Sequence, residues 1–173
     1  PLTTLVCWAF FDVAFVLGQF AADGGRENAL RILILGTGAN VLLWAGVLVA
    51  GAGIGSVPWE LVPAGGRGMT MWMMAGLLRL GLYPLHLTIP RSIGADSPLV
   101  AMHFVSPVLG WALLLRLALV SDRAIPAGSW MVVPAVLTFV VGSILAWTAS
   151  SARESRPWIG MAGNGAVLLA AIL

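Results

Sequence analysis

Charged residues are scarce in this sequence, and lysine is absent. Charged side chains make up 9% of the 173 residues, and all nine basic residues are arginine. Soluble globular domains carry about 25% charged residues. Hydrophobic residues reach 60% and the mean hydropathy is +0.98, so the composition indicates an integral membrane protein. The net charge of +2 is too small to indicate a nucleic-acid partner.

Several motifs that carry chemistry are also missing. The chain has one cysteine, Cys7, so it cannot form an internal disulfide, and we expect this residue to be a small core side chain in an apolar helix. There is no HxxxH, CxxC or carboxylate cluster in the sequence, which gives no support for a metal site. No glycine-rich strand–turn–helix motif occurs, so nucleotide binding has no support either.

Long apolar segments dominate what the sequence does contain. A membrane-spanning helix needs about 20 mostly apolar residues. Five segments meet this length and a sixth runs into the C-terminal end, with short polar connections between them. We therefore predict an all-α fold, a single transmembrane domain over residues 1–173 built as a polytopic helix bundle. The expected spans are 2–22, 30–54, 69–89, 98–120, 130–149 and 157–173.

Both ends of the chain resemble positions inside a longer protein. The first residue is not methionine, and the last span ends in the apolar run GNGAVLLAAIL without a polar cap. No charged segment precedes the first apolar run, as it would in a signal peptide. We therefore expect a fragment of a longer protein, with the sixth span truncated.

Two ionisable residues fall near the centres of their expected spans, Asp12 in the first and Arg79 in the third. Each costs about 2.5–3.5 kcal/mol at a helix centre on insertion scales, so such residues normally face the bundle interior and pair. Because their charges are opposite and their depths similar, we predict that Asp12 and Arg79 face each other. The pair is either part of an ion pathway or a static ion pair that fixes the packing.

The sequence directly after Arg79 disrupts a helix with Gly81, Pro84 and Pro90. A proline removes a backbone donor and leaves a carbonyl about one turn earlier without its partner. We predict that the third span is a broken helix, of the kind found at ion and substrate sites in transporters. A simple proline kink is the alternative. The arginine and the histidine that flank the break, Arg79 and His86, favour the functional interpretation.

Two histidines complete the set of candidate proton-pathway residues. His86 lies two residues after Pro84, and His103 lies near the start of the fourth expected span. Histidine titrates near neutral pH and can relay protons. His103 is the weaker candidate, because a single histidine in a bundle often serves only as a hydrogen-bonding group.

The stretch from Met74 to Arg116 resembles the antiporter-like membrane subunits of respiratory complex I and the related Mrp antiporters. Those subunits carry motifs close to F-P-x-H, L-P, T-P and L-L-L-R in this order. The matching positions here are Tyr83–His86, Ile89–Pro90, Ser97–Pro98 and Leu113–Arg116. The segment AFFDVAFVLG is similar to the helix with the family's intramembrane glutamate, and Asp12 stands at that position. The lysine of the family's broken helix falls on Arg79.

The resemblance implies that the chain is the central part of an antiporter-like subunit. Such subunits hold no redox centre and move protons while partner subunits oxidise NADH and reduce quinone. Asp12 would then modulate Arg79, and His86 would act as a relay. The resemblance further implies that this chain binds no cofactor and that its partners are other membrane subunits and the lipid bilayer. The moved ion would be the proton or sodium, and the location the bacterial cytoplasmic (inner) membrane.

The chain departs from the family pattern at both members of the pair. Arginine keeps its proton where a buried lysine can lose it, so Arg79 would act by charge movement or by gating water while Asp12 or a histidine carries the proton. Three functions stay open: a proton-translocating subunit of a complex I-like NADH:quinone oxidoreductase, an Mrp-type cation/proton antiporter subunit, and a non-pumping structural membrane subunit.

Overall fold

The computed structural model describes residues 2–21, 26–50, 66–84, 99–121 and 129–172. These residues form six α-helices and one short 3-10 helix, and none of them is in a β-strand. The all-α prediction is confirmed for this part of the chain. In order, the helices are α1 (Leu2–Ala21), α2 (Arg26–Val49), α3 (Arg67–Leu80), α4 (Leu99–Ser121), η3 (Ser129–Met131), α5 (Val132–Thr148) and α6 (Ala152–Ile172).

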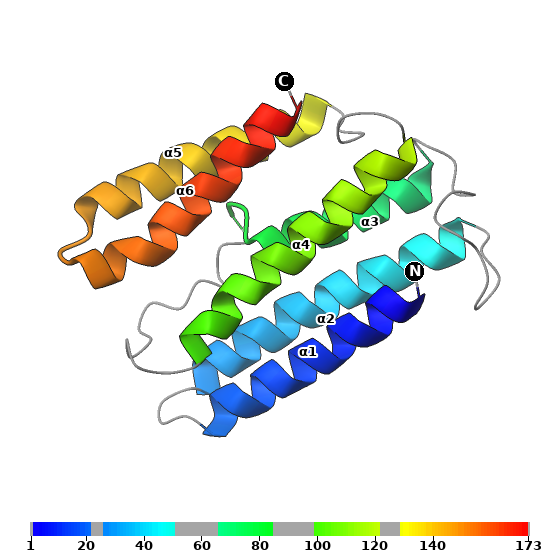
Figure 1. Cartoon of the computed structure of the whole chain (residues 1–173), viewed down its shortest axis with the longest axis horizontal. Helices are drawn as coiled ribbons and strands as arrows, with labels where there is room; N and C mark the ends of the chain where they lie inside the picture. The colour runs from blue at the N-terminus through cyan, green and yellow to red at the C-terminus, as the bar shows by residue number, and fades with distance from the viewer. Residues whose placement is uncertain (1, 22–25, 51–65, 85–98, 122–128, 173) are drawn as a thin grey trace.

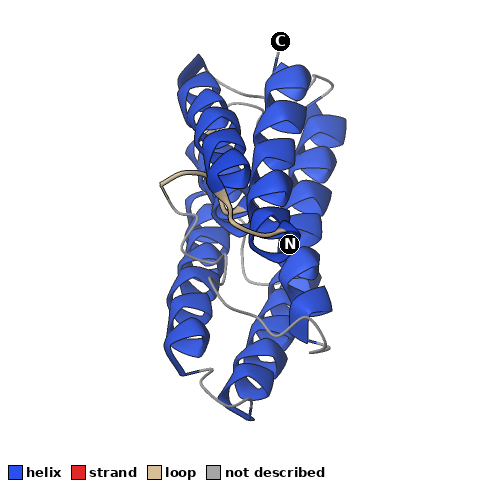
Figure 2. Ribbon diagram, turned by 90° about the vertical axis from the view of Figure 1, so that its left-hand side faces the viewer, coloured by secondary structure: helices blue, strands red, loops and turns tan. Residues whose placement is uncertain are grey.

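The helices are arranged as a bundle. Helices α1 to α4 lie side by side, and α5 and α6 form an antiparallel pair beside them (Figure 1). The axes run in roughly the same direction (Figure 2). The most extensive packing joins α1 to α2, α2 to α3, α3 to α4, and α5 to α6.

Helix α3 lies at the centre of this bundle. Nine of its 14 residues are buried. A single cluster of buried side chains joins α3 to α1, α2, α4 and α6, with Trp72 in contact with a core that includes Trp8, Leu43, Leu114 and Leu168. A helix that is buried around most of its circumference is a core helix. A charged side chain on the buried part of α3, such as Arg79, must therefore find its partners inside the protein.

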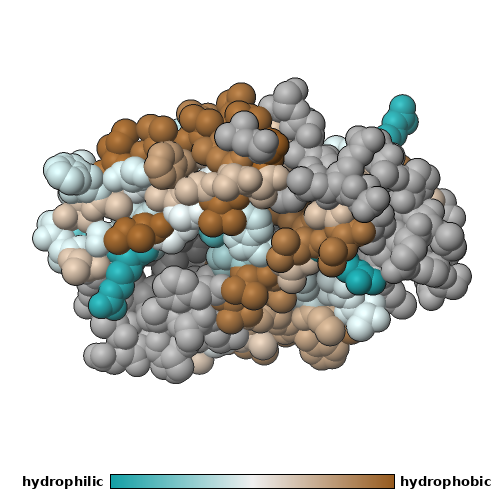
Figure 3. Space-filling model, turned by 45° about the horizontal axis from the view of Figure 1, so that its top comes forward, coloured by the Kyte–Doolittle hydropathy of each residue, from teal (hydrophilic) through white to brown (hydrophobic). Residues whose placement is uncertain are grey.

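Large apolar side chains are exposed on the outer surface of the described helices. Phe10, Ile34, Leu119 and Trp147 are between 68% and 91% exposed, and apolar patches are visible over the surface in Figure 3. Two helical segments, Thr3–Ala21 and Ala29–Val49, are long and apolar enough to cross a membrane by length and composition. They give weak support to the expected membrane location. The apolar segments of α4 (Val105–Leu119) and α5 (Val132–Thr148) are shorter. The predicted number of six spans therefore stays a prediction.

The third expected span, 69–89, contains a helix that ends at Leu80. Gly81 adopts the left-handed conformation (φ 65°), and its N–H donates to the carbonyl of Leu78 at 3.2 Å. Glycine ends helices in this way because it has no Cβ to clash at positive φ. Pro84 follows in a turn, and residues 85–89 lie outside the described residues.

Helix α6 begins five residues before the expected span. Ser151 Oγ accepts a hydrogen bond from the N–H of Glu154 at 3.3 Å, and Glu154 Oε2 accepts from the N–H and hydroxyl of Ser150. This serine–glutamate arrangement satisfies backbone donors at a helix start. Pro157 lies inside the helix rather than at its first position.

The prediction for Cys7 is wrong, because its side chain is exposed on α1. The buried face of this helix is formed by residues three to four positions apart, including Leu5, Trp8, Asp12 and Phe15. Cys7 lies off this stripe. Apolar surroundings in the sequence therefore did not identify the side of the helix that faces the core.

Candidate functional site

Asp12 of α1 and Arg79 of α3 form a buried ion pair in the centre of the bundle. Arg79 donates through Nη1 to Asp12 Oδ1 and through Nη2 to Asp12 Oδ2, both at 2.6 Å. The Arg79 side chain is 2% exposed and that of Asp12 is 8% exposed. This fork-to-fork geometry is the strongest form of arginine–carboxylate pairing. The structure thus brings together the two residues that the sequence paired.

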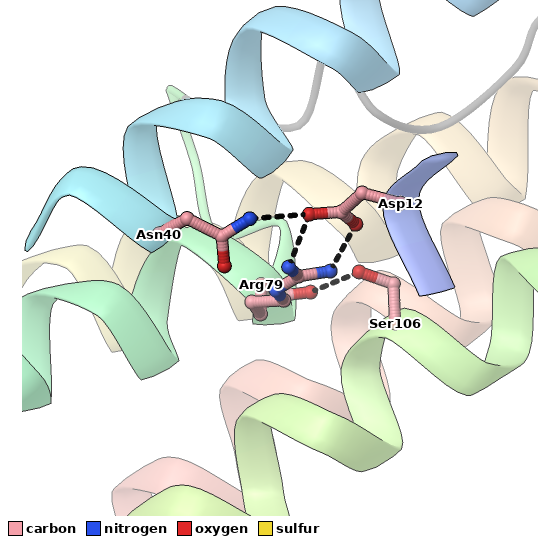
Figure 4. A network of polar contacts seen from close by, with 4 residues as sticks. All are labelled: Asp12, Asn40, Arg79 and Ser106. Carbon is pink, nitrogen blue, oxygen red and sulfur yellow. Dashed lines mark hydrogen bonds and ion pairs between the residues drawn. The ribbon is translucent and has the colours of Figure 1, made fainter. Parts of the chain in front are cut away.

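Asn40 of α2 is a third member of the site. Its Nδ2 donates to Asp12 Oδ2 at 2.9 Å, so that Oδ2 accepts from Asn40 and Arg79 together (Figure 4). Each carboxylate oxygen of Asp12 therefore accepts at least one hydrogen bond. The carboxylate thus has hydrogen-bond partners on both oxygens in its buried position.

Trp8 also contacts the guanidinium of Arg79. The ring of Trp8 lies 4.4 Å from Arg79 Cζ, a distance at which the aromatic face attracts the cation. Trp8 and Asp12 are four residues apart on α1, so both side chains project from the same face of that helix. Helix α1 therefore contributes both the counter-ion and the aromatic partner of Arg79.

Small residues let the helices approach closely enough for these contacts. A Cβ on Gly36 would lie 2.7 Å from Asp12 Oδ2, and a Cβ on Gly110 would lie 2.7 Å from the carbonyl of Gly76 and 3.1 Å from Arg79 Cβ. The two 2.7 Å distances are too short for an ordinary side chain. Gly36 is also one helical turn before Asn40, so one face of α2 offers both space and a donor to Asp12.

Side chains from other helices bind the backbone at the end of α3. Ser106 Oγ of α4 donates to the carbonyl of Arg79 at 3.4 Å, and Asn164 Nδ2 of α6 donates to the carbonyl of Leu80 at 3.2 Å. Asn164 Oδ1 in turn accepts from Trp111 Nε1 of α4 at 3.1 Å. The last carbonyls of a helix have no partner within the helix. These two side chains supply partners directly beside the ion pair.

Helix α5 provides a further contact just beyond the helix end. The N–H of Tyr83 donates to Thr138 Oγ1 at 2.9 Å, and Thr138 donates to the carbonyl of Pro134 at 2.5 Å. Thr138 is fully buried. The chain after Arg79 is consequently held by α4, α5 and α6 together.

The other predicted site residues are placed only in part. Gly81 ends α3 and Pro84 lies in the turn after it. His86 and Pro90 lie outside the described residues. The backbone of His103 is in α4, one turn before Ser106, but its side chain lies outside what the structure describes. Among the described residues, no group of three or more His, Cys, Asp or Glu side chains could hold a metal ion.

The sequence analysis did not identify Trp8, Asn40, Thr138 or Asn164 as site residues. The available signal was their polar or amphipathic side chains within apolar segments, since buried polar groups need hydrogen-bond partners. That signal shows which residues need partners, but the partners themselves depend on how each helix is rotated about its axis.

Comparison with known proteins finds no family model, no curated protein and no solved structure that matches this chain. Function is therefore inferred from the residues and their geometry.

Proposed function

We propose that this chain is a polytopic membrane protein that moves protons through the Asp12–Arg79 pair. More specifically, we propose that it is the antiporter-like proton-translocating subunit of a complex I-like NADH:quinone oxidoreductase in the bacterial cytoplasmic membrane. The observation that carries the proposal is the buried, bidentate ion pair at the end of a helix that stops one residue after Arg79. Charged residues at such positions in membrane bundles mark ion pathways.

In the proposed mechanism Asp12 is the group that binds and releases the proton. Arginine keeps its proton in proteins, so Arg79 changes the state of the site by moving its charge. While Arg79 holds the carboxylate, both oxygens accept hydrogen bonds from its guanidinium, and the positive charge of Arg79 opposes the binding of a proton. When Arg79 withdraws, the buried carboxylate loses its counter-ion and takes up a proton. The return of Arg79 expels that proton.

The position of Arg79 supports such a movement. It lies in the last turn of α3, where the helix dipole favours a cation. The backbone directly after it leaves the helix at Gly81 and is held by side chains rather than by continuing helical hydrogen bonds. A change of a few side-chain contacts can therefore shift the guanidinium without unwinding a whole helix. Broken helices serve this purpose in transporters.

Partner subunits would supply the energy for this movement. In the proposed assembly they bind NADH and quinone, while this chain binds neither and contacts other membrane subunits and lipid. The exposed apolar side chains of α1, α2 and α5 support contact with lipid or with such subunits.

The test is proton pumping by the whole assembly in sealed vesicles. Asp12→Asn keeps the shape of the side chain but removes the charge, so we expect quinone reduction to continue while pumping falls. Asp12→Glu keeps the carboxylate and should retain part of the pumping. Normal pumping by Asp12→Asn, in a subunit that is assembled, would contradict the proposal. Repeating the assay with sodium replaced by choline distinguishes the proton from sodium as the moved ion.

A non-pumping structural subunit is the second candidate. The observation that favours it is the completeness of the pair: two 2.6 Å hydrogen bonds from Arg79 and one 2.9 Å bond from Asn40 occupy the carboxylate. If the chain is structural, Asp12→Asn should lower the amount of assembled complex in the membrane. The complex that still forms should pump protons at the wild-type rate per turnover, because pumping would not depend on Asp12.

A further inference from the structure

Two buried polar atoms at the site have no hydrogen-bond partner among the described residues: Arg79 Nε and Asn40 Oδ1. Both belong to side chains that contact Asp12 through their other polar atoms. Leaving a buried donor or acceptor unpaired costs about 1–3 kcal/mol. More than nine-tenths of buried backbone groups and most buried side-chain groups in proteins do have a partner. The two atoms therefore require an explanation.

The unpaired atoms are one donor and one acceptor, and this defines the chemistry of a ligand. Arg79 Nε–H needs an acceptor, while Asn40 Oδ1 needs a donor. Figure 4 shows the Asn40 carbonyl directed away from the Asp12 carboxylate, on the side where the Arg79 side chain lies. A molecule that both donates and accepts hydrogen bonds satisfies both atoms at once.

Charge excludes most ligands other than water. A metal ion or an ammonium ion would lie beside the guanidinium of Arg79, and the described residues offer no acidic cluster to compensate. An anion would face the Asn40 carbonyl and the Asp12 carboxylate. A neutral molecule avoids both penalties. Water is the smallest neutral molecule that both donates and accepts hydrogen bonds.

We infer that one water molecule binds between Arg79 Nε and Asn40 Oδ1, on the side of the ion pair away from the hydrogen bonds to Asp12. Buried waters of this kind make two to four hydrogen bonds to otherwise unpaired groups. Its binding is inferred from the two unpaired atoms, whereas its use as a proton carrier for Asp12 rests on the proposed function.

The bond that admits this water to Asp12 is the one from Asn40. It joins a neutral amide to the carboxylate at 2.9 Å, whereas the two bonds from Arg79 are charge-assisted and 2.6 Å long. Neutral hydrogen bonds are the weaker kind. Breaking the Asn40 bond therefore frees Asp12 Oδ2 on the side of Asn40 while Arg79 still holds the carboxylate. This makes Asn40 a positioning residue for both the carboxylate and the water.

The experiment detects water at Arg79 Nε directly. The whole protein, labelled with ¹⁵N-arginine and reconstituted in lipid bilayers, is studied by solid-state NMR with magnetisation transfer from water. Arg79→Lys keeps the positive charge, removes Nε and so assigns the resonance. We expect the wild-type Arg79 Nε–H signal to receive magnetisation from water, and Asn40→Leu, which has a similar volume, to abolish that transfer.

Asn164→Leu is the matched control, since it removes a buried amide that contacts the backbone of α3 but not the guanidinium. The transfer should persist in this variant. A wild-type Nε–H signal without water contact would overturn the inference, and so would a scalar coupling that joins Nε–H directly to Asn40. The water contact is measured on the wild-type protein, so this test does not depend on whether a variant folds.

Transport measurements test the role of the water in proton transport separately from its presence at the site. If the wild-type protein shows the water contact and pumps protons, Asn40→Leu should lose both. Loss of the water contact with unchanged pumping would overturn the role of the water as a proton carrier. A wild-type assembly that shows the contact but does not pump would overturn the proposed function and leave the bound water standing.

Discussion

Gly36 of α2 lies directly against the carboxylate of Asp12. A Cβ built on Gly36 would be 2.7 Å from Asp12 Oδ2, whereas one built on Gly38 would meet no atom within 4 Å. The two glycines are two positions apart on one helix, yet only the first is required by packing. This difference provides a sharp test of the site.

Gly36→Ala should displace Asp12 and weaken its pair with Arg79. Overpacking of this kind typically costs about 1–3 kcal/mol. Gly38→Ala is the control and should be neutral or slightly stabilising, because alanine favours a helix over glycine by about 1 kcal/mol. Unfolding of both variants in mixed micelles with increasing denaturing detergent measures the free energy of unfolding. Equal effects of the two substitutions would contradict the close contact.

The charges of the pair should be strongly coupled. Asp12→Asn leaves Arg79 buried without its counter-ion, and removing one partner of a buried pair costs about 3–5 kcal/mol. Removing both charges with Asp12→Asn and Arg79→Gln together should cost less than the sum of the single changes, because no uncompensated charge remains. A double-mutant cycle on the free energy of unfolding measures this coupling. Additive effects would show that the two charges do not interact.

The pair itself could be predicted from the sequence, because a charge within an apolar segment must find a partner. Asp12 and Arg79 were the two ionisable residues near span centres, and they have opposite signs. A disruption of the helix after Arg79 could be predicted for the same kind of reason, since Gly81 and Pro84 are local signals, although the expected span extended to residue 89 and α3 ends at Leu80. These inferences need no knowledge of how the helices are oriented.

The surroundings of the pair could not be predicted, because they depend on helix rotation. Asn40 reaches Asp12 only because α2 turns this face toward α1, and the apolar residues of α2 are spread around the helix rather than gathered on one face. Cys7 was assigned to the wrong side of α1 for the same reason. The start of α6 was missed although Ser151 and Glu154 carry the capping pattern, since the apolar run begins only after them.

The aromatic contact of Arg79 should contribute to stability in a graded way. Trp8→Phe keeps an aromatic ring with a weaker attraction for cations, and we expect a loss of about 0.5–2 kcal/mol, within the range of cation–π interactions. The same substitution at Trp147, which is 91% exposed, is the control and should have little effect. Thermal unfolding of both variants in detergent makes the comparison. A larger loss at Trp147 than at Trp8 would contradict the assigned contact.

Thr138 should be needed to hold the chain after the end of α3. Its hydroxyl accepts from the N–H of Tyr83 and donates to the carbonyl of Pro134, whereas the hydroxyl of Thr148 donates only to carbonyls of its own helix and is exposed. Thr138→Val keeps the shape of the side chain but leaves the Tyr83 N–H without this acceptor, at a cost of about 1–3 kcal/mol.

Thr148→Val is the matched control for this change, because it removes the same hydroxyl from an exposed position whose hydrogen bonds to the described residues stay within α5. The measurement is amide hydrogen exchange at Tyr83, together with the free energy of unfolding. We expect faster exchange at Tyr83 in Thr138→Val, wild-type exchange in Thr148→Val, and recovery in Thr138→Ser, which restores a hydroxyl. Because Tyr83 is four residues after Arg79, unchanged exchange in Thr138→Val would show that α5 does not hold the chain beside the ion pair.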